Sequence, residues 1–288
     1  MSSTVAQWEL ALRLKGRRAE KGLSAGAVAK ELGFTRNYLS LVEHARTNLS
    51  EPKFDQLVDL YDFSAEDTAI IARLRSESKQ SGWWAKYSDV LAPTLIRYLG
   101  LEAGSESISA YESSIFNGLL QNEQYSYHLI KSSPQVARMQ IHPLREVRRH
   151  RRLSVGTPSG PKIMCVMNEA GLRQHVGPPG VLIDQLDYVI DLIHRLEDTV
   201  ELRVLPFTSS AGGSVAGGTL HLLEFASEIL PLVAWVETAF NTTGVADDPA
   251  QIRLAQATLE LAAEEALSRQ DSLELIKQVA EEIKAEHS

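Results

Sequence analysis

Cysteine and long apolar runs are both scarce in this chain of 288 residues. Its one cysteine, Cys165, excludes an internal disulfide and any metal site built from several cysteines, and its apolar neighbours in IMCVM favour a buried strand position. No apolar run approaches ~18 residues, so we expect no membrane span. The first residues, MSSTVAQWEL, lack the basic and then apolar pattern of a secretory signal. We therefore expect a cytoplasmic protein in a reducing compartment.

The sequence also lacks the common catalytic and metal-binding motifs. The eight histidines are scattered and none belongs to H-E-x-x-H, so no metal site is predicted. Residues 212–219, GGSVAGGT, resemble a phosphate-binding loop, but Gly218 stands where that loop needs lysine, and the segment leads into a predicted strand instead of a helix. We predict that the protein is not an enzyme and that it uses no cofactor.

The charge of the chain is uneven along its length. The formal net charge is -8, which is unusual for a protein that binds DNA. Residues 1–55 nevertheless carry nine Lys or Arg and six Asp or Glu, a local charge of +3, so the remaining residues carry -11. A basic segment on an acidic body is expected of a DNA reader whose body avoids nonspecific contact with phosphates.

Residues 24–46, SAGAVAKELGFTRNYLSLVEHAR, are typical of two short helices joined by a tight turn. Ser24 caps the first helix, Gly33 allows the turn and Thr35 caps the second helix. The apolar side chains fall on the inner faces: Val28, Ala29, Leu32, Phe34, Leu39 and Val42. The second helix leaves outside Arg36, Asn37, Ser40 and His44. Such a pair lets the second helix lie in a DNA major groove with its N-terminal side chains against base edges.

The rest of the chain changes from helical to strand periodicity. Two further helices, at residues 50–61 and 63–79, complete an N-terminal domain that ends near residues 80–82. An aromatic-rich and mostly helical stretch follows, and then a helix that holds Leu144 and Val147. Short segments with strand patterns are residues 162–167, 200–205, 219–225 and 232–236. The last two form a predicted hairpin, a helix at 181–196 separates the first two, and two final helices break near residues 270–272.

A family resemblance rests on the segment LKGRRAEKGLS, residues 14–24, and on motif residues after it. These are Val28, Ala29, Thr35, Leu39, Ser40, Val42, Glu43 and Arg46. They resemble the Cro/C1-type (XRE) helix-turn-helix family. The rest of the chain resembles actinobacterial, antitoxin-like regulators in which this module precedes a domain of unknown function. That likeness lies in GWW (82–84), LGLEA (99–103), GLLQNEQY (118–125), NEAGL (168–172), QL (185–186) and VLPF (204–207).

The resemblance implies a transcriptional regulator, often paired with a small acidic protein encoded nearby, and it carries no catalytic residue. It also implies that Arg18 and Glu43 face one another as a partly buried ion pair between the first and third helices. The family commonly ends the recognition helix with glycine, where this chain has Ala45. The chain must therefore accept a left-handed conformation at an alanine or continue the helix slightly.

Position in this motif assigns the predicted DNA contacts. Arginine pairs with guanine and asparagine with adenine through two hydrogen bonds, and a leucine can meet a thymine methyl group. The predicted base-reading residues are Arg36, Asn37, Tyr38, Ser40 and Leu41. The predicted phosphate contacts are Ser24, Thr35, Arg46, Lys15, Arg17 and Lys53. The alternative is a solvated polar face on an ordinary helix, against which the turn and the local basic charge argue.

Two features of the second half are candidates for a partner or ligand site. Arginines recur at the spacing of one helix face, at Arg145, Arg148, Arg149 and Arg152. This arginine stripe is either a solvated face or a contact for an acidic partner, a phosphate-bearing ligand or DNA. Trp83 and Trp84 begin an aromatic segment that reaches Tyr127 and forms either core or the wall of a ligand cavity.

We predict an α+β, mostly α protein with a Cro/C1-like helical DNA-binding domain at residues 1–80. Residues 81–288 form a helical sensor, partner-binding and dimerisation domain with a small, mainly antiparallel sheet. The protein binds a double-stranded DNA operator as a homodimer, because one recognition helix reads too few bases for strong specificity. A small-molecule ligand or a small acidic protein partner controls it. The alternative is an antitoxin-like interaction protein that mainly sequesters a small partner protein.

Overall fold

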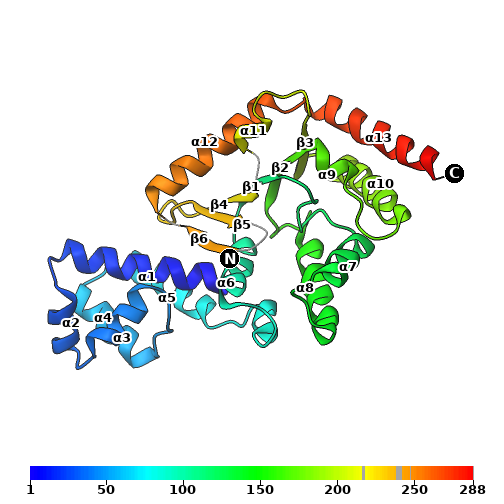
Figure 1. The fold of residues 1–288 in the computed structure, drawn as a ribbon. Helices are drawn as coiled ribbons and strands as arrows, with labels where there is room; N and C mark the ends of the chain where they lie inside the picture. Colours follow the sequence, from blue (N-terminus) through cyan, green and yellow to red (C-terminus); the bar gives the residue numbers. More distant parts are fainter. Residues whose placement is uncertain (216–217, 238–241, 247, 288) are drawn as a thin grey trace. The chain divides into compact units, whose positions relative to one another are not determined.

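The computed structural model describes residues 1–215, 218–237, 242–246 and 248–287. The chain divides into two compact units (Figure 1). The first comprises Met1–Trp83 with Ser227–Leu230, and the second comprises Trp84–Ala226 with Pro231–Ser288. The predicted α+β, mostly helical class is confirmed, with helices in both units and one mixed sheet in the second. No described helix is long and apolar enough to cross a membrane.

The first unit is a bundle of short helices, which the structure describes in full. They are α1 (Ser3–Glu20), α2 (Ala25–Glu31), α3 (Arg36–Glu43), α4 (Glu51–Tyr61) and α5 (Ala65–Ser78). Their apolar faces meet in one core that includes Leu14, Val28, Leu39, Leu57 and Leu74. The inward placement predicted for α2 and α3 is confirmed, since Val28, Ala29, Leu39 and Val42 are buried and Leu32 and Phe34 are half-buried.

The first three helices end in the same way. Gly22, Gly33 and Ala45 follow α1, α2 and α3 with left-handed φ angles of 66°, 64° and 54°. After α3, the Ala45 amide donates to the Val42 carbonyl and the Arg46 amide donates to the Leu41 carbonyl, which is the Schellman pattern. The left-handed alternative at Ala45 is therefore the one that the chain adopts.

The second unit contains the sheet and the longer helices. Its helices are α6 (Pro93–Glu102), α7 (Glu123–Ser132), α8 (Ile141–Ser154), α9 (Glu169–Arg173), α10 (Pro179–Arg195), α11 (Gly212–Val215), α12 (Pro249–Glu265) and α13 (Arg269–Glu286). Its strands are β1 (Ser107–Glu112), β2 (Lys162–Asn168), β3 (Val200–Leu205), β4 (Thr219–Glu224), β5 (Val233–Glu237) and β6 (Thr242–Ala246). Two short 3-10 segments lie at Trp83–Tyr87 and Arg138–Gln140.

The six described strands form one sheet in the order β3-β2-β1-β4-β5-β6. The pairs β1–β2 and β2–β3 are parallel, whereas β1–β4, β4–β5 and β5–β6 are antiparallel. The predicted hairpin of β4 and β5 is confirmed. The sequence interpretation was wrong at β1, which lies inside the stretch that we expected to be mostly helical, and it missed β6.

Two smaller expectations also need correction. The last two helices break at residues 266–268 instead of 270–272, because the Ser268 hydroxyl accepts the Asp271 amide hydrogen bond and so starts α13 earlier. Of the loop-like segment 212–219, residues 212–215 form α11, and residues 216–217 lie outside the described part of the chain.

The sheet has two differently covered faces. Helix α12 contacts β1 to β5 on one face, where Leu259 and Ala262 pack with Tyr111 and Val166. The opposite face is set by strand register. Ala110 pairs with His221, and His221 pairs with Trp235 on the next strand, so these three side chains share a face. This second face carries the polar residues of the site described below.

Candidate functional site

Helix α3 presents a polar first turn to solvent. The Thr35 hydroxyl accepts a hydrogen bond from the Tyr38 amide at 3.0 Å and fixes the start of the helix. Leu39 and Val42 are buried beneath it. Of the predicted base-reading residues, the structure leaves Arg36, Asn37 and Ser40 exposed and Leu41 half-buried.

Tyr38 occupies a different environment from the other predicted base-reading residues. Its ring packs edge-on against Phe34, with the ring centroids 5.3 Å apart. The Lys53 ammonium lies 3.8 Å from the centre of the Tyr38 ring. Burial raises the pKa of Tyr38. Tyr38 and Lys53 thus support α3 and α4, a role that the sequence interpretation did not foresee for either residue.

The Arg36 side chain folds toward the start of α2. A Cβ atom on Gly26 would lie 2.8 Å from one terminal nitrogen of Arg36, so a side chain at this position would push the guanidinium aside. The Ser24 hydroxyl at the same helix start accepts the Ala27 amide hydrogen bond at 3.1 Å. The structure therefore brings Arg36 and Ser24 to the same end of α2.

The remaining phosphate candidates divide into two groups. Lys15 and Arg46 are exposed. The Arg17 guanidinium instead donates to the carbonyl groups of Tyr61 and Asp62, the last carbonyls of α4. Arg17 thereby ties α1 to the end of α4, which leaves fewer of its donors for a phosphate.

A buried ion pair joins the first helix to the third. Arg18 Nε lies 2.5 Å from Glu43 Oε1, and Arg18 Nη2 lies 2.8 Å from Glu43 Oε2. The two side chains are only 15% and 4% exposed. The hydrogen bond that Arg18 donates to the Glu43 carboxylate raises the pKa of Arg18, against the effect of burial. The pair implied by the family resemblance is confirmed.

The second unit contains a cavity of about 490 Å³. Its floor is the sheet face that carries His221 and Trp235, and its walls come from α6, α8 and the segment after β1. Apolar side chains supply much of the wall, including Leu95, Phe116 and Val147. This size is within the ordinary range for small-molecule sites.

One part of the polar network beside this cavity is the pair Glu102–Arg151. Arg151 donates from Nε and Nη2 to the two carboxylate oxygens of Glu102, each at 2.7 Å. Burial alone would lower the pKa of Arg151, but the Glu102 carboxylate outweighs it, so the pKa is raised. The Tyr98 hydroxyl also donates to Glu102, at 3.0 Å.

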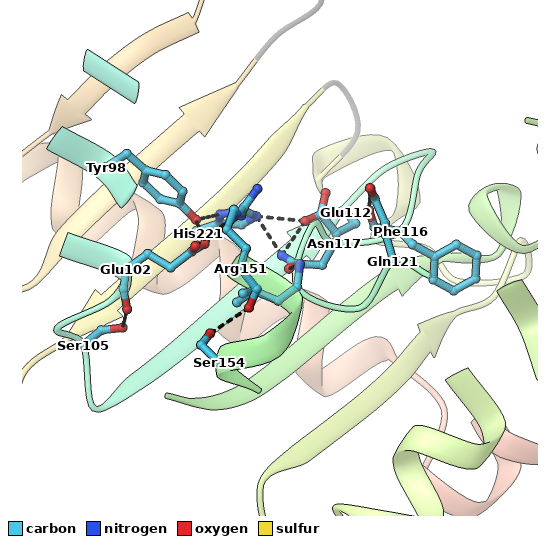
Figure 2. A network of polar contacts seen from close by, with 11 residues as sticks. Tyr98, Glu102, Ser105, Glu112, Phe116, Asn117, Gln121, Arg151, Ser154 and His221 are labelled. Atoms are coloured by element: carbon cyan, nitrogen blue, oxygen red, sulfur yellow. Dashed lines mark hydrogen bonds and ion pairs between the residues drawn. The ribbon is translucent and has the colours of Figure 1, made fainter. Parts of the chain in front are cut away.

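His221 connects this pair to a second carboxylate. Its Nδ1 lies 2.7 Å from the Tyr98 hydroxyl and its Nε2 lies 2.8 Å from Glu112 Oε1. Figure 2 shows His221 between the Tyr98 ring and Glu112. Asn117 Nδ2 and the Thr219 hydroxyl donate to the same carboxylate, at 2.8 Å and 2.6 Å. Both buried carboxylates of the cavity are therefore held by several donors.

Each of the two units contains a segment that matches a family model. A helix-turn-helix domain model matches residues 9–69, and a model described as Domain of unknown function (DUF5753) matches residues 95–278. The chain belongs to the DUF5753 family. Searches of curated proteins and of solved structures found no significant match.

The two matches coincide with the two groups of site residues. The helix-turn-helix match contains α2 and α3 with all their exposed polar residues, and it identifies a DNA-binding protein of transcription regulation. The DUF5753 region contains Tyr98, Glu112, Arg151 and His221, so the cavity is part of the family domain.

Within the DUF5753 region, the predicted arginine stripe is not a single solvated face. Arg145 pairs with Glu123 at 2.7 Å, and Arg149 pairs with Glu146 at 3.2 Å. Arg152 is partly exposed, but Arg148 lines the cavity. Of the two predicted tryptophans, Trp83 is half-buried and Trp84 is buried.

The sequence interpretation missed the polar network of this DUF5753 chain. On α8, Leu144, Val147, Arg148 and Arg151 recur at the spacing i, i+3, i+4 and i+7, and this was the available signal. Arg148 and Arg151 therefore lie on the same face of the helix as the apolar Leu144 and Val147, and this face points inward. Glu102 and Gln121 lay within segments already quoted for the resemblance, but neither was assigned a role. Nothing local pointed to Glu112, Asn117 or His221.

Proposed function

We propose that the protein is a sequence-specific transcription regulator of the Cro/C1 type whose α3 reads an operator. The observation that carries this proposal is the exposed first turn of α3, where Arg36 and Asn37 stand on a helix fixed by the Thr35 cap and the Arg18–Glu43 pair. Arginine and asparagine are the residues with the best-matched hydrogen bonds to guanine and adenine. A rigid helix holds them in position for such contacts.

The protein acts as a homodimer in this proposal. One short recognition helix contacts only a few base pairs, and two copies related by a twofold axis double the number of base pairs that are contacted. Their recognition helices then enter successive major grooves about 34 Å apart. The operator is accordingly an inverted repeat.

The second unit supplies dimerisation and control in this proposal. Its cavity can admit a small molecule, and the exposed parts of Arg145, Arg149 and Arg152 can contact a small acidic protein. The cavity serves binding instead of catalysis, because its two buried carboxylates are engaged by neighbouring donors and no exposed nucleophile is held against them among the contacts described.

Selection of bound sequences from a random DNA pool tests the proposal, with the full chain as the selecting protein. We expect enrichment of an inverted repeat whose half-sites lie about 10 to 11 base pairs apart, centre to centre. The doubly substituted variant Arg36→Ala/Asn37→Ala is the matched control and should enrich no sequence. If the unaltered chain enriches none but retains a stoichiometric small protein, the antitoxin-like alternative replaces this proposal.

A further inference from the structure

We infer that the cavity of the second unit binds a small organic acid, an apolar body that carries one carboxylate, and that Arg148 is the residue that pairs with this carboxylate. The inference deepens the proposed function, on which its regulatory meaning rests, because it names the chemical class of the input. The inference is based on the hydrogen bonds around the cavity and on the residues that line it.

Arg148 is the residue of the cavity that indicates a bound ligand. It lines the cavity, yet it donates no hydrogen bond to any residue within the described part of the chain. Arg148 is half-buried, and its guanidinium offers five donors to whatever occupies the cavity. Burial and then the neighbouring charge of Arg151 lower the pKa of Arg148 to about 10, against the opposing charges of the carboxylates Glu237, Glu102 and Glu112.

Three carboxylates lie near Arg148, and none of them hydrogen-bonds to it among the described residues. Glu237 lines the same cavity and its charge acts on Arg148 more strongly than those of Glu102 and Glu112. Glu102 accepts two hydrogen bonds from Arg151 and one from Tyr98. Glu112 accepts from Asn117, Thr219 and His221. Within the described part of the chain, the Arg148 guanidinium therefore has no hydrogen-bonded acceptor, although Glu237 stands near enough to compete with a bound anion.

The acceptor is better matched by a carboxylate than by a phosphate. The planar fork of arginine fits a carboxylate with two parallel hydrogen bonds. A phosphate dianion would bring a second negative charge near Glu237, Glu102 and Glu112, whose own charges repel it. A single acidic group meets the available donors with less repulsion.

The other residues that line the cavity indicate the shape and polarity of the rest of the ligand. The Tyr98 ring of the wall and the Trp235 ring of the floor have their centroids 4.5 Å apart, and Leu95, Phe116 and Val147 add apolar surface. Gln121 donates from Nε2 to the Phe116 carbonyl, which leaves its buried Oε1 without a partner among the described residues. An aromatic or branched apolar body with one N–H or O–H donor fits this wall.

Calorimetric titration of the full chain, without DNA, tests the inference with three probes of one shape. Indole-3-acetate carries a carboxylate and a ring N–H, indole-3-acetamide is its neutral analogue, and tryptamine carries a positive charge. We expect indole-3-acetate to bind at least about tenfold more tightly than the amide, with tryptamine the weakest. Equal binding of acid and amide, or no binding of the acid, overturns the inference.

Variants of α8 assign the acid binding to the cavity. Arg148→Met should weaken indole-3-acetate by at least about tenfold, and Arg148→Lys should retain part of the affinity. Arg149→Met, one residue further on the exposed side of the helix, is the matched control and should bind the acid as the unaltered chain does. Loss in Arg149→Met with retention in Arg148→Met would place the anion on the surface and overturn the inference.

The melting temperature separates a binding role of Arg148 from a structural one. Without ligand, Arg148→Met should melt at the same or a higher temperature, because it removes a half-buried charge that lies beside Arg151 and makes no hydrogen bond to a described residue. A lower melting temperature together with unchanged acid binding would show that Arg148 only supports the fold. Because none of these measurements contains DNA, failure of the operator selection would leave their outcome unaffected.

Discussion

Arg148 and Arg151 lie side by side over Gly118, where an added Cβ would be 2.5 Å from the Nη1 atom of each. Of the two, Arg151 has a carboxylate partner within the described residues, and Arg148 has none. Glu102 is the carboxylate that hydrogen-bonds to this pair, through Arg151, while the charge of Glu237 acts on both arginines. This relationship makes the stability of the second unit sensitive to which member of the cluster is removed.

Removal of Glu102 should therefore destabilise the fold more than removal of Arg151. Glu102→Gln leaves the buried Arg151 guanidinium beside the half-buried Arg148 without its hydrogen-bonded carboxylate, and we expect a loss of about 3 to 5 kcal/mol of unfolding free energy. Arg151→Met should cost at least about 1 kcal/mol less, because Glu102 keeps Tyr98 and gains Arg148 as a partner. Urea unfolding of the full chain measures both, and a larger loss in Arg151→Met would contradict this reading.

The Arg18–Glu43 pair should stabilise the first unit far more than an exposed pair does. Arg18→Met leaves the Glu43 carboxylate buried, and we expect a loss of up to about 3 kcal/mol. Lys21→Met is the control, since Lys21 pairs with an Asp62 side chain that is 81% exposed, and should cost less than about 1 kcal/mol. Thermal unfolding of the full chain compares the two, and equal losses would mean that the Arg18 pair is solvated in solution.

The left-handed helix ends predict two opposite changes in stability. Ala45 has a φ of 54°, so Ala45→Gly should relieve strain and stabilise the first unit by about 0.5 to 1 kcal/mol. Gly33→Ala should destabilise it by about 1 kcal/mol, because nothing lies within 4 Å of the added Cβ and only the conformational penalty remains. Denaturant midpoints of both variants test this, and destabilisation by Ala45→Gly would argue against the left-handed end.

The helix-turn-helix was predictable because its signals are local. Ser24 and Thr35 cap their helices through amides three residues away, and Gly33 takes the positive φ that the turn requires. Hydrogen bonds of this kind join residues only a few positions apart, so the residue types that form them can be recognised from the sequence. The same holds for the strand at Cys165, which is fully buried as its apolar neighbours indicated.

Strand β1 and the cavity could not be predicted from local patterns. Strand β1 is six residues long, and its hydrogen-bonding partners on β2 and β4 lie about fifty and more than a hundred residues away along the chain. The polar network likewise joins Tyr98 to His221 across 123 residues. Neighbouring arginines on α8 differ in environment because Arg151 meets Glu102 of α6 and Arg148 faces the cavity, whereas Arg149 is exposed; these contacts depend on residues far away in the sequence.

The central claim is that α3 reads bases, and the affinity of single variants for preferred and random DNA tests it most directly. Arg36→Ala and Asn37→Ala should each lose about 1 to 3 kcal/mol of binding free energy on the preferred site and much less on random DNA. Lys15→Ala is the matched control, which should weaken both alike and reduce the salt dependence by about one charge. Equal losses on preferred and random DNA for Arg36→Ala and Asn37→Ala would contradict base reading by this helix.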